Sequence, residues 1–328
     1  MALLEVEDLR VSFFTPEGEI QAVSGISFQL ERGKVLGIVG ESGSGKSVTS
    51  YSIMQILEKS GRITGGSIKL DGQELVGAGE QVMKKLRGDR ISMIFQDPMT
   101  SLNPTYTVGH QLTEGILLHT PRNQKQAQKR AVEMLRLVGV NEPEKRMRQY
   151  PHQLSGGMRQ RVMIAMALAC EPDILIADEP TTALDVTIQA QILELMQRLQ
   201  KELGMAILLI THDLGVVAQM CDEVIVMYAG TICEQGTVEE IFYDPRHSYT
   251  KGLLRSVPTL ENEERLRPIA GTPIDLTNMP QGCPFAPRCE DAMKICLRRR
   301  CQRVPVNRNH YAACWNDVAK RESGGCSE

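Results

Sequence analysis

One short stretch of the chain has the residue types and spacing that bind phosphate. It reads, in order, Gly40, Glu41, Ser42, Gly43, Ser44, Gly45, Lys46, Ser47 and Val48. This is the Gly-x-x-x-x-Gly-Lys-Ser pattern of a P-loop, in which glycines let backbone N–H groups turn toward phosphate oxygens at a helix N-terminus. We expect Lys46 to reach the β- and γ-phosphates of a nucleotide, and the hydroxyl of Ser47 to bind Mg2+.

The sequence on either side of this stretch supports that interpretation. The apolar run VLGIVG, residues 35–40, predicts a buried strand, and KSVTSYSIMQIL, residues 46–57, predicts a helix. A glycine turn before an ordinary helix is the alternative. The strand, loop and helix together favour the phosphate site.

An acidic pair follows a second apolar strand. Asp178 and Glu179 end the run DILIAD, so their carboxylates are expected at the carboxyl edge of a parallel sheet, where ligands of open α/β sheets bind. Asp178 suits a direct or water-mediated contact to Mg2+, and Glu179 suits polarising an attacking water. Taken alone, such a pair is more often a helix cap or a solvated pair.

The rest of the pattern predicts an α/β fold with a parallel sheet core, an antiparallel β subdomain and a helical subdomain. Alternation over residues 3–40 predicts antiparallel strands, and residues 100–160 read as a helical insertion. Residues 173–178, 206–211 and 223–230 are short strand candidates separated by helices. Prolines crowd the sequence beyond residue 244, which predicts an ATPase domain at 1–244 and a small irregular, cysteine-rich region at 245–328.

Composition makes several classes of function less favoured. A net charge of -3 gives no global electrostatic reason to bind nucleic acid. No apolar run approaches the roughly 18 to 20 residues of a membrane span, and the acidic start MALLEVEDLR does not fit a secretory signal. We therefore expect a cytosolic chain. In that reducing setting, the six cysteines from Cys283 to Cys326 favour a metal site over disulfides.

Between the two phosphate-site motifs lies LSGGM, residues 154–158, followed by RQR, and this stretch resembles the signature sequence of ABC-family ATPases. Further matches to that family follow in order: Phe13 for the aromatic residue that stacks on adenine, Gln96 for the Q-loop, Ala183-Leu184-Asp185 for the D-loop and His212 for the switch histidine. Phe14 is an alternative to Phe13. Met158 departs from the more usual glutamine.

The resemblance implies that two such domains meet head to tail and share their ATP sites. Ser155, Gly156 and Gly157 would contact the γ-phosphate of ATP held by the partner domain. His212 would hold the γ-phosphate and the attacking water, and Gln96 would link Mg2+ to the surface that receives the membrane subunits. Catalysis is then expected to involve Glu179, His212, Gln96 and Lys46.

Four longer stretches resemble the peptide and nickel importer subfamily, especially dipeptide and oligopeptide permease ATPases: residues 95–109, YPHQLSGGM at residues 150–158, residues 177–193 and RHSYTKGLL at residues 246–254. The resemblance implies a second, related but different ATPase chain, two transmembrane permease subunits and an extracytoplasmic peptide-binding protein, with this chain peripheral on the cytoplasmic face of the inner membrane. Nickel or another small solute is the alternative cargo. A soluble ABC ATPase acting on DNA or ribosomes is the remote alternative.

The late cysteines resemble a C-terminal motif that carries a 4Fe-4S cluster in some dipeptide permease ATPases. The candidate ligands are Cys283, Cys289, Cys296 and Cys314, in the order C-x5-C-x6-C-x17-C. Zinc and unmetallated reduced thiols remain alternatives, although the spacing lacks the C-x2-C pairs of a zinc ribbon. Cys301 is an alternative to Cys314 as the fourth ligand.

Overall fold

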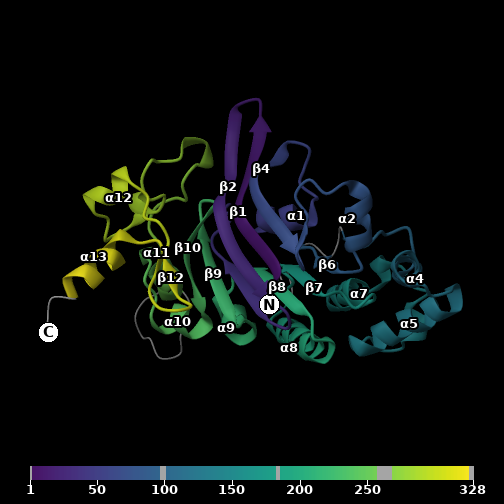
Figure 1. The fold of residues 1–328 in the computed structure, drawn as a ribbon. Coiled ribbons are helices and arrows are strands. Elements are labelled where there is room, and N and C mark those ends of the chain that lie inside the picture. The colour runs from purple at the N-terminus through teal and green to yellow at the C-terminus, as the bar shows by residue number, and fades with distance from the viewer. Residues whose placement is uncertain (1, 97–100, 182–184, 257–267, 325–328) are drawn as a thin grey trace. The chain divides into compact units, whose positions relative to one another are not determined.

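The computed structural model describes residues 2–96, 101–181, 185–256 and 268–324. The chain divides into two compact units. The unit that we call the P-loop unit comprises residues 4–29, 36–76 and 211–328, and the signature unit comprises residues 1–3, 30–35 and 77–210. Figure 1 labels the elements of both, and each unit is described separately below.

The P-loop unit contains two groups of paired strands. In one, the order is β2-β1-β4-β5, with β1 antiparallel to β4; in the other it is β11-β12-β10-β9-β3, with β3 parallel to β9 and the remaining pairs antiparallel. The strands are β1 (Ala2–Thr15), β2 (Gly18–Glu31), β3 (Val35–Val39), β4 (Gly61–Leu70), β5 (Gln73–Glu74), β9 (Glu223–Tyr228), β10 (Thr231–Thr237), β11 (Val304–Pro305) and β12 (Tyr311–Ala312). The antiparallel strands expected near the N-terminus are present.

The helices of the P-loop unit are short. They are α1 (Lys46–Met54), α9 (Leu214–Met220), α10 (Val238–Tyr243), α11 (Ser248–Arg255), α12 (Lys294–Arg298) and α13 (Trp315–Gly324), with 3-10 turns η2 (Leu276–Asn278) and η3 (Ala286–Arg288). Tyr228, Tyr249 and Phe285 pack together in a buried cluster, with the ring centroids of Tyr249 and Phe285 5.2 Å apart. Elements from both sides of residue 244 therefore share one core.

The signature unit combines parallel strands with a helical segment. Its strands β6 (Ile91–Ile94), β7 (Ile174–Asp178) and β8 (Ala206–Thr211) run parallel, with β7 between the other two. Its helices are α2 (Glu80–Leu86), α4 (Val108–His119), α5 (Gln124–Leu137), α6 (Pro143–Arg146), α7 (Gly156–Leu168) and α8 (Val186–Leu203), with a 3-10 turn η1 (Pro151–Gln153). In Figure 1, α4, α5 and α7 lie together, as the helical insertion predicts, and each contacts the other two.

Helix α5 shows how the sequence determines this segment. Asn123 caps its N-terminus by accepting a hydrogen bond from the backbone N–H of Gln126, whose side chain returns one to Asn123. The buried residues Ala127, Ala131 and Met134 follow at spacings of four and three, which gives the helix one apolar face. That face packs α5 against α4 and α7.

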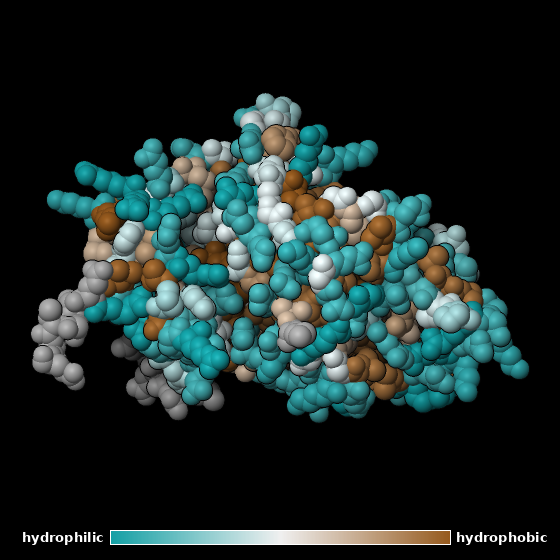
Figure 2. Space-filling model, in the orientation of Figure 1, coloured by the Kyte–Doolittle hydropathy of each residue, from teal (hydrophilic) through white to brown (hydrophobic). Residues whose placement is uncertain are grey.

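The last part of the chain, residues 268–324, consists of short elements joined by loops, as the crowded prolines predict. Figure 2 shows hydrophobic residues interspersed with hydrophilic ones where α12 and α13 lie in Figure 1, and Leu297 of α12 is 62% exposed. The predicted boundary at 244/245 lies just after α10, inside the P-loop unit, and stays a prediction. Among the described residues, no helix has both the length and the apolar character that a membrane span requires.

Candidate functional site

The P-loop has the backbone conformation that its glycines predict. Gly40 has φ 154° and Gly45 has φ 99°, in the left-handed half of conformational space that side chains disfavour. A Cβ atom on Gly40 would overlap the carbonyl oxygen of Met227, and one on Gly45 would lie 2.7 Å from that of Ala22. The loop therefore needs glycine at both positions. It leads directly into α1, whose first residue is Lys46.

The side chain of Lys46 lies along the P-loop and is 6% exposed. Its ammonium group donates hydrogen bonds to the carbonyl oxygens of Gly40, at 2.8 Å, and Glu41, at 2.9 Å. The neighbouring Ser44 is buried, and its carbonyl oxygen accepts a hydrogen bond from Gly230 at 3.0 Å. The lysine is thus held in the loop where a phosphate would lie. Ser47 is half-buried on the first turn of α1.

Glu41 connects the P-loop to the late part of the chain, a contact that the sequence analysis did not anticipate. Its carboxylate forms a two-pronged ion pair with Arg288, at 2.6 and 3.0 Å. Its backbone N–H donates to the hydroxyl of Tyr249 at 2.8 Å. The hydrogen bonds to Glu41 raise the pKa of Arg288, and burial raises that of Tyr249. No local pattern signals pairing between residues 247 positions apart.

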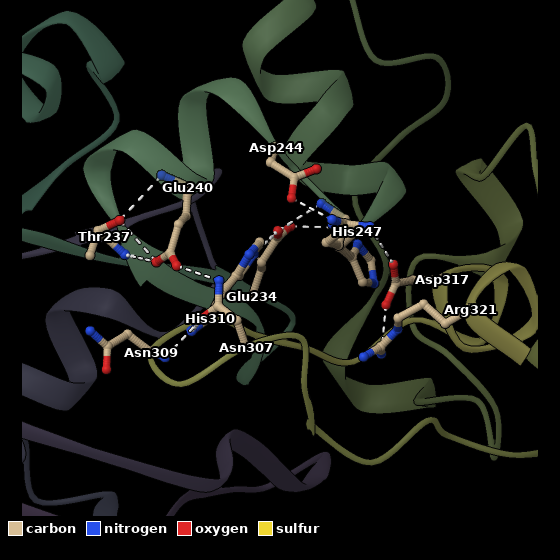
Figure 3. Close-up of polar contacts among 11 residues, drawn as sticks. Glu234, Thr237, Glu240, Asp244, His247, Asn307, Asn309, His310, Asp317 and Arg321 are labelled. Carbon is tan, nitrogen blue, oxygen red and sulfur yellow. Dashed lines mark hydrogen bonds and ion pairs between the residues drawn. The ribbon is translucent and has the colours of Figure 1, made fainter. Parts of the chain in front are cut away.

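A buried polar network positions the helix that carries Tyr249 (Figure 3). Glu234 of β10 is fully buried and accepts hydrogen bonds from the backbone N–H of His247, at 2.9 Å, and from that of Arg246. It also lies 2.7 Å from Nε2 of His310, next to β12. His247 caps α11 by accepting from the N–H of Tyr249, and burial lowers the pKa of His247 to about 4, so it is neutral at pH 7.

The acidic pair lies at the carboxyl end of β7 in the signature unit, as expected. Asp178 is fully buried, and the backbone of Glu179 has φ 48°, an unusual value for a residue with a side chain. The N–H of Glu179 donates to Ile210 of β8 at 2.8 Å, which fixes this turn. The carboxamide of Gln96 donates to the Glu179 carboxylate at 2.9 Å. Two residues proposed for catalysis from separate motifs are therefore in direct contact.

The signature residues form the beginning of α7. Ser155 is its N-cap, and the serine hydroxyl accepts a hydrogen bond from the N–H of Met158 at 3.4 Å. Gly156 and Gly157 form the first turn, where backbone N–H groups have no partner within the helix. These residues line a cavity with Asp185 and Ile188 at the start of α8. Ala183 and Leu184 of the D-loop lie outside the described residues.

His212 and Phe13 belong to the P-loop unit and are described with it. His212 follows β8 and is exposed. Phe13 is half-buried, and its ring would lie 2.9 Å from a Cβ atom on Gly61 of the paired strand β4. Phe14 is 46% exposed, and the guanidinium of Arg62 lies 5.7 Å from the centre of its ring. The choice of Phe13 for adenine stays a prediction.

Four of the late cysteines line one cavity in the P-loop unit. Cys283, Cys289, Cys296 and Cys314 all lie on it, together with Trp315. The N–H of Cys283 donates to the carbonyl oxygen of Cys296 at 2.7 Å, which joins two of the segments that carry them. Cys301 lies on a second cavity, with Cys233 and Cys283.

The arrangement of these thiols does not form a site for a single metal ion. Within residues 2–96, 101–181, 185–256 and 268–324, no three His, Cys, Asp or Glu side chains are grouped so as to hold one. Burial raises the pKa of Cys283 to about 11 and also raises that of Cys289, so both thiols are protonated at pH 7. The iron-sulfur assignment stays a prediction.

Two family models match the chain. The model described as ABC transporter matches residues 23–182, which contain the P-loop and the signature residues. The model described as Oligopeptide/dipeptide transporter, C-terminal region, matches residues 233–296, which contain three of the four candidate cysteine ligands.

Individual proteins with known names are similar to this chain over most of its length. The chain is 58% identical over 316 residues to the oligopeptide transport ATP-binding protein OppD of Bacillus subtilis, covering 95% of this chain and 88% of that protein. It is 56% identical to the dipeptide transport ATP-binding protein DppD of the same organism, covering 95% and 94%. Among solved structures, it resembles the dimeric ATP-binding cassette MJ0796 bound to ADP and Pi, with TM-score 0.65 and 27% identity over 72% of this chain and 98% of that one.

Proposed function

This chain belongs to the ATP-binding proteins of oligopeptide and dipeptide ABC transporters, and from that membership we propose how its residues energise peptide import. The chain is an ATPase with the ABC cassette fold. The observation that carries the proposal is the P-loop, whose glycines adopt positive φ angles and whose Lys46 is enclosed by the loop at the start of α1, as a phosphate site requires. Residues 40–48 bind the triphosphate, and Phe13 stacks on the adenine.

Hydrolysis depends on placing a water in line with the γ-phosphate and stabilising the charge that develops there. Glu179 polarises that water, and Gln96 holds the Glu179 carboxylate through the hydrogen bond between their side chains. His212 holds the γ-phosphate and the water. Lys46 neutralises charge on the β- and γ-phosphates.

The residues that would hold Mg2+ are Ser47, Gln96 and Asp178. Their hydroxyl, carboxamide and carboxylate groups supply oxygen ligands, which are the ligands that Mg2+ prefers. The carboxylate of Asp178 is fully buried at the end of β7. When bound, the ion neutralises charge on the nucleotide phosphates.

One chain provides half of each complete site. Ser155, Gly156 and Gly157 present a hydroxyl and helix N-terminal N–H groups to the γ-phosphate of ATP on a second ATPase chain, related to this one but different. Closure of the pair on ATP and its reopening after hydrolysis drive two membrane-spanning permease subunits. An extracytoplasmic peptide-binding protein delivers the cargo, and this chain lies peripherally on the cytoplasmic face of the membrane.

The cargo assignment is tested by uptake. Cells that lack this chain are expected to lose uptake of a labelled dipeptide, to regain it with the wild-type gene and not to regain it with Glu179→Gln, because closure without turnover cannot complete a transport cycle. Nickel uptake measured in the same cells is expected to be unaffected. Loss of nickel uptake with unchanged peptide uptake would instead assign the chain to metal import.

We also propose that Cys283, Cys289, Cys296 and Cys314 hold a 4Fe-4S cluster. The support is the donor set, since four thiols from separate segments line one cavity and four thiolates are the usual ligands of such a cluster. When bound, the cluster would cross-link loops that have little regular structure. Its place outside the ATP motifs favours a structural role.

The cluster proposal predicts about four iron and four acid-labile sulfide per chain after anaerobic purification. Cys296→Ser and Cys314→Ser should each lower both contents, whereas Cys301→Ser is the matched control because Cys301 does not line the cavity that the four proposed ligands share. Zinc without sulfide would assign a zinc site. Full-length protein with neither metal nor sulfide would leave the cysteines as reduced thiols.

A further inference from the structure

Glu41 is held through all three of its polar groups. Its carboxylate pairs with Arg288, its N–H donates to the hydroxyl of Tyr249, and its carbonyl oxygen accepts from the ammonium of Lys46. The first two contacts come from the region after residue 244. The third comes from the lysine that reaches for phosphate. Glu41 therefore connects the region after residue 244 to Lys46 of the P-loop.

The ion pair between Arg288 and Glu41 is held in place by the surroundings of Arg288. The side chain of Arg288 is only 5% exposed, and its guanidinium also donates to the carbonyl oxygen of Ala270 at 3.0 Å. Its carbon lies 5.8 Å from the ring centre of Tyr228, whose hydroxyl accepts another of its hydrogen bonds. A planar guanidinium held on several sides loses little further freedom when it pairs with a carboxylate. Tyr249 is fully buried as well.

Arg288 also balances charge. The carboxylate of Glu41 belongs to the loop that must receive a triphosphate, and an unpaired negative charge there would oppose binding. Pairing with Arg288 removes that penalty. The side chain of Glu41 is only 25% exposed. If Arg288 were removed, water could therefore not fully solvate the carboxylate that it leaves unpaired.

We propose that Arg288 and Tyr249 are positioning residues of the ATP site, so that the region after residue 244 completes the P-loop instead of merely following it. This inference rests on the proposed assignment of residues 40–48 to the triphosphate. Arg288 acts through Glu41, by neutralising its carboxylate, and Tyr249 acts by orienting its backbone. Lys46 is positioned in turn by the carbonyl oxygen of Glu41.

The test measures the Kd of the full-length chain for Mg2+ and a fluorescent ATP analogue. Arg288→Gln is expected to raise Kd by roughly tenfold, and Arg288→Lys by less, because lysine keeps the charge but loses the two-pronged geometry. In a Glu41→Gln background, the same Arg288→Gln change should raise Kd less than about threefold, because no carboxylate is left to neutralise. Tyr249→Phe is expected to raise Kd by a few-fold.

Arg303→Gln is the matched control. Arg303 anchors the same region to Ser27 and Gln235, away from the P-loop, and its loss is expected to leave Kd unchanged. A wild-type Kd for Arg288→Gln, or an equal effect of that change with and without the Glu41 carboxylate, would overturn the inference. Absence of nucleotide binding by the wild-type chain would refute the proposed site itself, so the two failures are distinguishable.

Discussion

Replacing Glu179 with glutamine is expected to lower kcat for ATP hydrolysis by about 10²- to 10⁴-fold while leaving the affinity for ATP close to that of the wild type. Glutamine has nearly the same shape as glutamate, and its carbonyl oxygen can still accept the hydrogen bond from Gln96. What it loses is the negative charge that polarises water. Phosphate release by the assembled transporter measures turnover, and nucleotide titration measures binding.

Glu194→Gln is the control for that experiment. Glu194 is exposed on α8 of the same unit, so its replacement removes the same charge without touching the turn after β7. Turnover by Glu179→Gln at the rate of this control would show that the role assigned to Glu179 is wrong.

Replacing Lys46 with alanine is expected to weaken ATP binding, whereas Glu179→Gln leaves binding unchanged and lowers turnover. In the proposed site the lysine donates to phosphate, and the loss of one such charge-assisted hydrogen bond costs about 1.5 to 3 kcal/mol, so the Kd for ATP should rise by at least about 10- to 150-fold. The change also removes the hydrogen bonds to Gly40 and Glu41 and loosens the loop. Titration with a fluorescent ATP analogue measures the effect.

Lys201→Ala, at an exposed position in the last turn of α8, controls for the loss of one positive charge. It should bind nucleotide as the wild type does. Equal affinities of Lys46→Ala and this control would contradict the assignment of the P-loop. Together with Glu179→Gln, the two variants separate binding from turnover.

Much of the fold could be predicted because its elements are specified locally. The apolar run at residues 35–40 forms β3, with α1 directly after the glycines, and the run ending in Asp178 forms β7. Helix α5 lies in the segment predicted to be helical, and its cap and its buried face both follow from residues of the helix itself and the residue before it. In each case the residues that determine the element lie within it or next to it, so periodicity and turn chemistry are sufficient.

The contacts between distant segments could not be predicted in this way. The resemblance implied a common site for four thiols, and the cavity that Cys283, Cys289, Cys296 and Cys314 line does not include Cys301; the choice of ligands stays a prediction. By contrast, no periodic pattern in the sequence indicates that Glu41 pairs with Arg288 or that Glu234 is buried beside His310. Such contacts depend on how strands and loops far apart in the chain come together.

The separation between Glu41 and Arg288 has a consequence for biosynthesis. The two residues are 247 positions apart, so at about 5 to 20 residues per second a ribosome needs about 12 to 50 s to travel from one to the other. Throughout that interval, a nascent chain has the P-loop but not the arginine that neutralises the carboxylate of Glu41. Polypeptides that are still being translated, or that proteases have shortened from the C-terminal side, would therefore compete poorly for cellular ATP.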